Sequence, residues 1–212
     1  NEVFKLNYSI DTYRKNEQKQ LTDEEKQFYL RNGTLVVVDE NMRNLANEIT
    51  AGAISTMEKA RAIFHYVVNH FKYMYPPKGR GIKSFLEAKQ GDCGEYSFMF
   101  SSLCRSIGIP CRSLVGSWAN SKFNAHVWNE FFDEQTGWIP VDCSMAYIQK
   151  KKKSQFLLSN VRTLKWTAYF GQLEQQRVVF SYDAELYLSP KYNDLDKQTI
   201  VDSKYPPIVP FQ

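Results

Sequence analysis

Apolar residues recur at helical spacing in two parts of the chain. One set follows Ser55-Thr56-Met57-Glu58, a capping-box pattern that starts a helix, and Tyr75-Pro76-Pro77 is expected to end that helix (Ala60, Ile63, Phe64, Val67, Val68 and Phe71). The other set has the same spacing and ends at Gly108, a residue type that commonly stops helices (Tyr96, Met99, Phe100, Leu103, Cys104 and Ile107). We therefore expect two helices, each buried on one side, and counting back places the start of the second near Asp92 or Cys93.

Shorter helices are predicted near the N-terminus. Thr22-Asp23-Glu24-Glu25 is another capping-box pattern and predicts a helix that extends through residue 30. A further short helix is expected to include residues 45–49. Residues 1–50 are thus expected to form a helical N-terminal extension, and residues 51–212 a single compact catalytic domain.

Strand-like runs dominate the chain after Pro110. Three of them follow one another, at residues 112–118, 126–132 and 137–143. Residues 133–137 between the last two are typical of a hairpin turn, so those strands are predicted to be antiparallel neighbours, and His126 and Asp142 can then face each other. Two more strands are predicted at residues 177–182 and 185–188. The order of elements predicts an α+β fold.

Composition narrows the class of protein. The chain has 212 residues, of which 43% are hydrophobic and 24% charged, which is enough apolar content for a packed core and argues against disorder. The net charge of +4 does not by itself favour nucleic acid or a membrane surface. Lys150-Lys151-Lys152-Lys153 is interpreted as a solvated loop, with an anionic partner as the alternative.

Location is open to more than one interpretation. No apolar run approaches the roughly 20 residues of a membrane-spanning helix. The chain starts at Asn1, which is consistent with a removed signal peptide and equally with a cloning boundary. A periplasmic or extracellular location is favoured, and a cytoplasmic one stays open.

Three residues with complementary chemistry occur in the order Cys93, His126 and Asp142. A thiol becomes a good nucleophile when an imidazole takes its proton, and a carboxylate on the other ring nitrogen fixes the required tautomer. Cys93 is expected in the first turn of its helix, where N–H groups and the helix dipole stabilise a thiolate. Each residue taken alone has an ordinary structural interpretation, but the three together favour a catalytic triad.

The other cysteines and histidines receive structural interpretations. These are Cys104, Cys111 and Cys143, with room for at most one disulfide among them, together with His65 and His70. None of the cysteines has zinc-ligand spacing with the histidines, so we expect no metal and no cofactor.

The residues around the predicted triad resemble the transglutaminase-like superfamily, whose core is related to papain-type cysteine peptidases. The resemblance rests on Gly91-Asp92-Cys93-Gly94-Glu95-Tyr96, on residues 103–112, on His126-Val127-Trp128-Asn129-Glu130 and on Gly137-Trp138-Ile139-Pro140-Val141-Asp142. It implies a nucleophile helix packed on an antiparallel sheet, as in bacterial members, many of which look like hydrolases. Cys143, where many members have Pro or Ala, and Ser97, where bacterial relatives often have His, depart from the pattern.

The resemblance and the triad together predict acyl transfer on amide or peptide bonds through a Cys93 thioester. Hydrolysis by a cysteine peptidase or amidase is expected first, since the sequence suggests a small single domain. The alternatives are protein-glutamine gamma-glutamyl transfer and a non-catalytic peptide-binding module. Trp128 is predicted to shield His126 or to line the substrate cleft, with a core role as the alternative, and Gln90 is a weak candidate for the second oxyanion donor. The expected partner is a peptide or protein substrate rather than nucleic acid, and the oligomeric state stays open.

Overall fold

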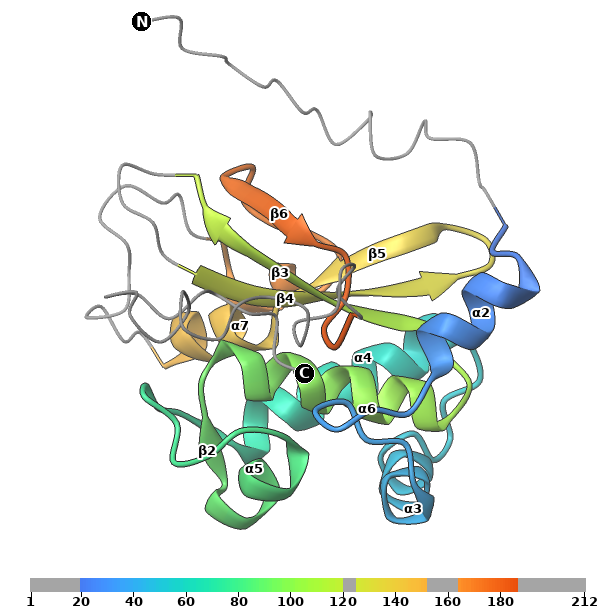
Figure 1. Cartoon of the computed structure of the whole chain (residues 1–212), viewed down its shortest axis with the longest axis horizontal. Coiled ribbons are helices and arrows are strands. Elements are labelled where there is room, and N and C mark those ends of the chain that lie inside the picture. Colours follow the sequence, from blue (N-terminus) through green and yellow to red (C-terminus); the bar gives the residue numbers. More distant parts are fainter. Residues whose placement is uncertain (1–19, 120–124, 152–163, 187–212) are drawn as a thin grey trace, which may run out of the picture.

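The computed structural model describes residues 20–119, 125–151 and 164–186 (Figure 1). Its helices are α2 (Asp23–Leu30), α3 (Glu40–Ile49), α4 (Thr56–His70), α5 (Ile82–Ala88), α6 (Cys93–Ser106), α7 (Cys143–Lys150) and the 3-10 helix η2 (Trp166–Tyr169). Its strands are β1 (Lys72–Tyr73), β2 (Gln90–Gly91), β3 (Cys111–Trp118), β4 (Ala125–Asp133), β5 (Gly137–Val141) and β6 (Arg177–Ser181). In the described part of the chain, no helix is both long and apolar enough to cross a membrane.

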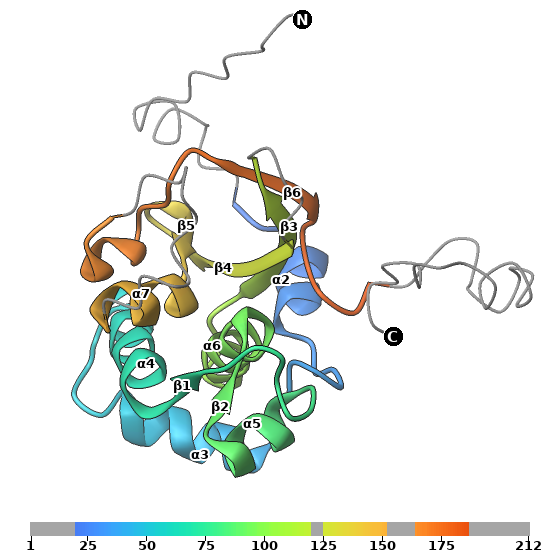
Figure 2. The same ribbon diagram turned by 90° about the vertical axis from the view of Figure 1, so that its left-hand side faces the viewer.

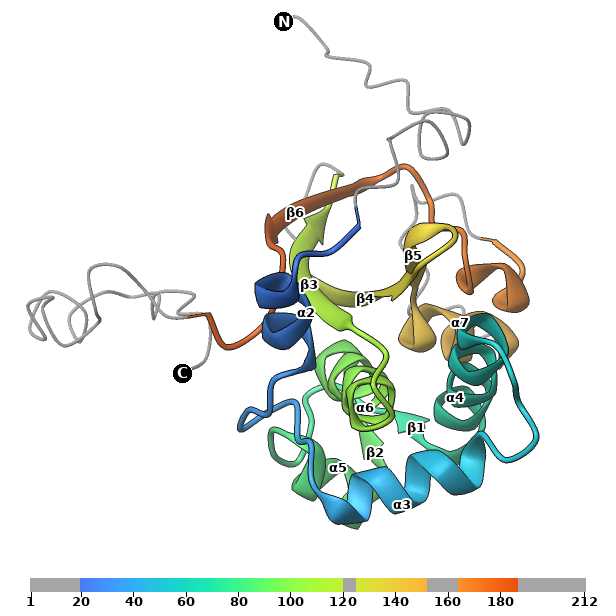
Figure 3. The same ribbon diagram turned by 90° about the vertical axis from the view of Figure 1, so that its right-hand side faces the viewer.

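Helix α6 runs through the centre of the molecule. Figures 2 and 3 show it nearly end on, with the four-stranded sheet on one side and α3, α4 and α5 around the rest. All its residues from Gly94 to Ser106 are buried, so the prediction that one side faces solvent is wrong. Some of its polar groups are paired inside: Asn129 of β4 donates to the Ser97 carbonyl and to Ser101 Oγ, both at 2.9 Å. Buried hydroxyls that find partners can occupy a core position.

The sheet has the strand order β5-β4-β3-β6, and its neighbours are antiparallel. The predicted hairpin is confirmed, since β4 and β5 pair from Asp133↔Gly137 to Asn129↔Val141. The third predicted strand was too long: β5 ends at Val141, and Asp142 caps α7 by accepting from the Met145 N–H. Cys143 therefore begins a helix and is not in a strand. The next predicted strand is confirmed as β6.

The last predicted strand covers residues 185–188, and the first two of these residues are not in a strand. Glu185 has a φ of +57°, which is incompatible with extended pairing, and Leu186 is not in a strand either. Residues 187 and 188 lie outside the described part of the chain.

The helix starts follow the local capping signals. Thr22 and Ser55 form the predicted capping boxes of α2 and α4, and α3 covers the predicted helix around residues 45–49. Helix α4 ends at His70, before the predicted stop at Tyr75-Pro76-Pro77. The chain there turns extended, because β1 pairs in parallel with β2. This short pair and α5 were not predicted.

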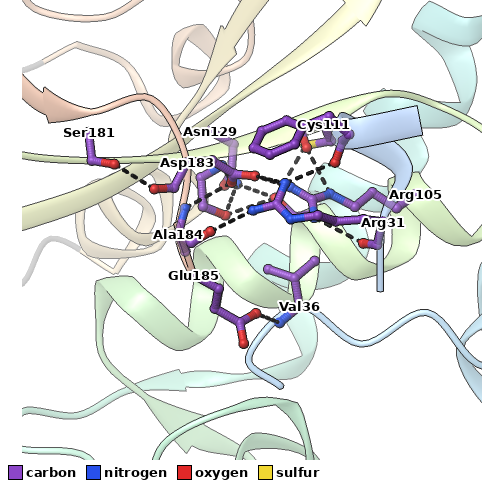
Figure 4. Close-up of polar contacts among 12 residues, drawn as sticks. Arg31, Val36, Arg105, Cys111, Asn129, Ser181, Asp183, Ala184 and Glu185 are labelled. Carbon is purple, nitrogen blue, oxygen red and sulfur yellow. Dashed lines mark hydrogen bonds and ion pairs between the residues drawn. The ribbon is translucent and has the colours of Figure 1, made fainter. Parts of the chain in front are cut away.

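A buried carboxylate ties the N-terminal segment to the end of β6 (Figure 4). Asp183 Oδ2 accepts from Arg31 at 2.7 Å and from Arg105 of α6 at 2.8 Å, and Oδ1 accepts from the Ser113 N–H of β3. Glu185 accepts from the backbone N–H of Val36 in the same segment. These contacts hold α2 beside the sheet, while the domain boundary at residue 50 stays a prediction.

Candidate active site

Cys93 is the first residue of α6, as predicted, and Asp92 is its N-cap. The Asp92 carboxylate accepts from the Gly94 N–H at 2.8 Å, and Glu95 completes a capping box. The bend before the helix requires a glycine at position 91, because an added Cβ would lie 2.8 Å from the Cβ of Glu95. The sequence thus places a half-buried cysteine at the start of a central helix.

The surroundings of Cys93 raise the pKa of its thiol well above the ordinary value. Burial of the thiol is the main cause, and the negative charges of Asp92 and Asp142 add to it. The backbone N–H of Val127 and the more distant Arg80 act in the opposite direction. The position at a helix N-terminus therefore does not make a thiolate by itself, contrary to expectation, and a nearby cation is needed. The hydrogen bond from the Val127 N–H places the sulfur against β4, at the residue that follows His126 in the sequence.

His126 and Asp142 meet as the hairpin predicts. His126 Nε2 lies 2.7 Å from Asp142 Oδ2, and the two residues are 6% and 1% exposed. Because Nε2 faces the carboxylate, Nδ1 is the nitrogen left to exchange a proton with a thiol. The structure thus brings the three predicted residues to one place, at the ends of α6, β4 and β5.

The two oxygens of Asp142 have different partners. Oδ1 accepts from Ser144 Oγ and from the Met145 N–H, both at 2.8 Å, and so caps α7. Oδ2 faces His126 and accepts from Arg177 Nη1 at 2.7 Å. Burial by itself raises the pKa of Asp142, but His126, Arg177 and the hydrogen bonds outweigh it and hold that pKa well below its usual range. Asp142 is therefore ionised at all working pH values.

Arg177 is a residue that the sequence reasoning missed. Arg177 is the first residue of β6, and its side chain is 5% exposed and contacts both Asp142 and Glu174. A charged residue at the start of an otherwise apolar strand is a weak signal, and nothing in the sequence pairs it with a carboxylate 35 positions away.

Aromatic rings enclose the imidazole. Trp118 of β3 stacks on His126 with ring centroids 4.9 Å apart, and Trp128 stacks at 6.0 Å. Trp128 lies on the face of β4 predicted for it and is 2% exposed, so it is placed to shield the imidazole, and its contact with substrate stays a prediction. Gly116, opposite His126 in β3, allows this packing, because an added Cβ would lie 2.8 Å from the Trp128 ring.

The remaining candidates lie apart from this chemistry or stay untested. Cys104, Cys111 and Cys143 are buried free thiols, in keeping with their structural interpretation. A cavity of about 550 Å³ lies between α3 and α4 and is lined by His65 and His70, but by none of the triad. Gln90 forms part of β2, and its role as an oxyanion donor stays a prediction. In the described residues, no group of His, Cys, Asp and Glu could hold a metal ion.

Comparison with known proteins places this part of the chain in a family context. The sequence profile of the transglutaminase-like superfamily matches residues 43–143, which include Cys93, His126 and Asp142. A protein-glutamine gamma-glutamyltransferase of Pseudomonas aeruginosa is 29% identical over 91 residues, which cover 35% of this chain and 14% of that protein. The chain therefore spans only a small part of this relative.

Solved structures share the fold. The periplasmic domain of TgpA from Pseudomonas aeruginosa superposes with a TM-score of 0.54 and 20% identity, covering 67% of this chain and 55% of that one. A candidate cysteine protease from Cytophaga hutchinsonii has a TM-score of 0.52 and 18% identity, covering 58% of this chain and 43% of that one. Both superpositions show a shared fold, and the roles of Cys93, His126 and Asp142 stay a prediction. Residues 43–143 of the chain thus match the transglutaminase-like superfamily.

Proposed function

We propose that the protein is an acyl-transfer enzyme that hydrolyses amide or peptide bonds through a thioester on Cys93. The observation that carries the proposal is the 2.7 Å contact between His126 Nε2 and Asp142, beside the thiol at the start of α6. The contact occupies Nε2 and leaves Nδ1 as the ring nitrogen that can take a proton, which is what a general base for the thiol needs.

The reaction follows from this geometry. His126 Nδ1 takes the proton of Cys93, and the thiolate attacks the carbonyl carbon of the amide. The backbone N–H of Cys93 and a second donor, with Gln90 as a candidate, hold the oxyanion. The imidazolium gives its proton to the leaving nitrogen, the C–N bond breaks, and the thioester and a free amine form. Asp142 stays ionised throughout and stabilises the imidazolium.

The second half-reaction decides the class of enzyme. When water attacks the thioester, His126 takes a proton from it, the C–S bond breaks, and a carboxylic acid is released with the thiol restored. Water is the most abundant acceptor, so hydrolysis is the expected outcome unless the site excludes water. The name of the Pseudomonas aeruginosa relative favours a second candidate, in which a primary amine attacks the thioester of a glutamine side chain.

One experiment separates these outcomes. The purified protein is given a broad peptide library together with a tagged primary amine, and products are identified by mass spectrometry with Cys93→Ala as the blank. Cys93-dependent cleavage without tag incorporation is the expected result. Incorporation at glutamine side chains would instead establish a transglutaminase. If neither product forms and the Cys93→Ala variant still binds peptide, a peptide-binding module would replace the proposed enzyme.

A further inference from the structure

A buried pair of charges lies behind the triad. Arg177 donates to Glu174 through Nη2 at 2.6 Å and through Nε at 3.2 Å, and it donates to Asp142 through Nη1 at 2.7 Å. The side chains of Arg177 and Glu174 are 5% and 3% exposed. Tyr169 donates its hydroxyl to the other oxygen of Glu174. Arg177 and Glu174 are thus held in place by neighbours on both sides.

Arg177 also packs against the same two tryptophan rings as the imidazole of His126. Its guanidinium lies over the Trp118 ring at 4.4 Å and the Trp128 ring at 5.2 Å, and both rings stack on His126. Arg177 Nη1 and His126 Nε2 each lie 2.7 Å from Asp142 Oδ2, so the two nitrogens are separated by at most twice that distance. A fixed cation therefore competes with the imidazolium for one carboxylate oxygen.

The charge count shows why this arrangement can still support catalysis. Asp142 and Arg177 alone cancel each other, which leaves the imidazolium without a net counter-charge. Glu174 adds a second negative charge, so the buried group of three residues carries one net negative charge, and a protonated His126 balances it. Burial lowers the pKa of Arg177, but Asp142 and Glu174 outweigh this and raise it, so the guanidinium stays charged.

We infer that Glu174 and Arg177 are positioning residues whose opposed charges set the pH range in which the Cys93 thiolate and the His126 imidazolium coexist. The inference rests on the proposed function, because it concerns the ion pair of that same site. Neither residue touches the reacting atoms. They act through Asp142: the positive charge of Arg177 offsets the negative charge of that carboxylate, and Glu174 restores it.

The surrounding charged and titratable groups form a constant background. They are Asp92, Glu95 and Arg80 around the start of α6, and the phenols of Tyr73 and Tyr169, whose pKa values burial raises. None of them is itself substituted in the variants. Tyr169 contacts Glu174, but burial raises the pKa of its phenol and keeps it protonated, so a shift between variants reports on the charge that was removed.

The direction of each shift follows from the sign of the charge. Glu174→Gln removes a negative charge, so the thiolate forms and the imidazolium loses its proton at lower pH, by about one pH unit. Arg177→Gln removes a positive charge, and both events move to higher pH by about one to two units. The double variant Glu174→Gln with Arg177→Gln keeps the net charge, so its pH range is expected to return close to that of the unaltered protein.

The test needs no substrate. The rate of alkylation of Cys93 by iodoacetamide is measured against pH, with mass spectrometry to identify the modified cysteine, and the protonation of His126 is followed by NMR. Only three histidines are present in the sequence, so His126 can be assigned with His65→Gln and His70→Gln variants. If Arg177→Gln does not fold, the comparison of Glu174→Gln with the double variant still reports the effect, because the double variant leaves no unpaired buried charge.

The outcomes separate the two proposals. Opposite shifts that cancel in the double variant support the inference. Unchanged midpoints, with only the maximal rate altered, would show a merely structural role for Glu174 and Arg177 and would overturn the inference while the triad stands. If Cys93 of the unaltered protein reacts only as an ordinary thiol with a pKa of about 8.5, His126 does not activate it. The proposed function and the inference about Glu174 and Arg177 then both fail.

Discussion

Replacing Asp142 with asparagine separates two tasks that this one carboxylate performs. Oδ1 caps α7 through Ser144 and Met145, whereas Oδ2 faces His126 and Arg177. In Asp142→Asn the amide oxygen can stay at the cap, where Asn serves as well as Asp. The amide N–H₂ then points at two donors, and His126 can keep a hydrogen bond only by accepting through Nε2. That tautomer carries its proton on Nδ1 and cannot take one from Cys93.

The structure gives a magnitude for each consequence. Arg177 loses one of its two carboxylate partners in a buried site, which costs about 2–3 kcal/mol of folding free energy, below the roughly 3–5 kcal/mol for leaving a buried charge wholly unpaired. Asp142→Ala also loses the cap, which adds about 1 kcal/mol. The wrong imidazole tautomer lowers turnover by about 10³–10⁴-fold. Asp142→Asn should thus lose most activity and keep α7, and Asp142→Ala should lose both.

The pH dependence of stability tests the same reasoning. The pKa of Asp142 is depressed in the folded protein, so the unfolded chain binds its proton first as the pH falls. Its stabilising contribution is complete above the ordinary carboxyl pKa of about 3.9 and is lost as the pH falls toward the lower folded value. Asp142→Asn removes this contribution, so its deficit relative to the unaltered protein should shrink at acid pH.

Urea unfolding of both variants between pH 3 and pH 7, beside a peptidase assay, measures these quantities. Equal stability of Asp142→Asn and Asp142→Ala would refute the division of the two oxygens. Full activity of Asp142→Asn would remove Asp142 from the triad.

Three further predictions follow from single contacts. Cys93→Ala should abolish turnover and change the unfolding temperature by only a few degrees, because the residue is only half buried and the change removes a single sulfur atom; severe unfolding would count against this placement. Gly116→Ala should destabilise the protein by about 2–4 kcal/mol in urea unfolding, because the new Cβ would lie 2.0 Å from the Val178 carbonyl oxygen, and an unchanged midpoint would contradict that close contact. Burial, and then the hydrogen bond and charge of Asp92, raise the pKa of Glu95 to about 7, so stability should fall by about 2–3 kcal/mol as the pH rises from 4.5 to 7. Glu95→Gln should flatten this slope in unfolding titrations, and an unaltered slope would assign it to another group.

The parts of the fold that the sequence predicted depend on short-range signals. The capping boxes at Thr22 and Ser55, the start of α6 near Asp92 and the hairpin between β4 and β5 each need only a few neighbouring residues. The strands β1 and β2 could not be predicted, because two residues show no periodicity and each strand is extended only through pairing with the other.

Asp142 shows where pattern reasoning stops. The alternation of apolar residues continued the strand through Cys143, but the carboxylate bonds to the Met145 N–H and turns the chain into α7. The hairpin could place Asp142 near His126 because a ladder fixes which residues are opposite. It could not show that Arg177, from another edge of the sheet, shares the same oxygen. That contact depends on the packing of β6 against β3, which only the folded chain specifies, and it decides how much negative charge is available to the imidazolium. The residues of the proposed triad are thus indicated by local sequence patterns, while the charges around Asp142 are a property of the tertiary structure.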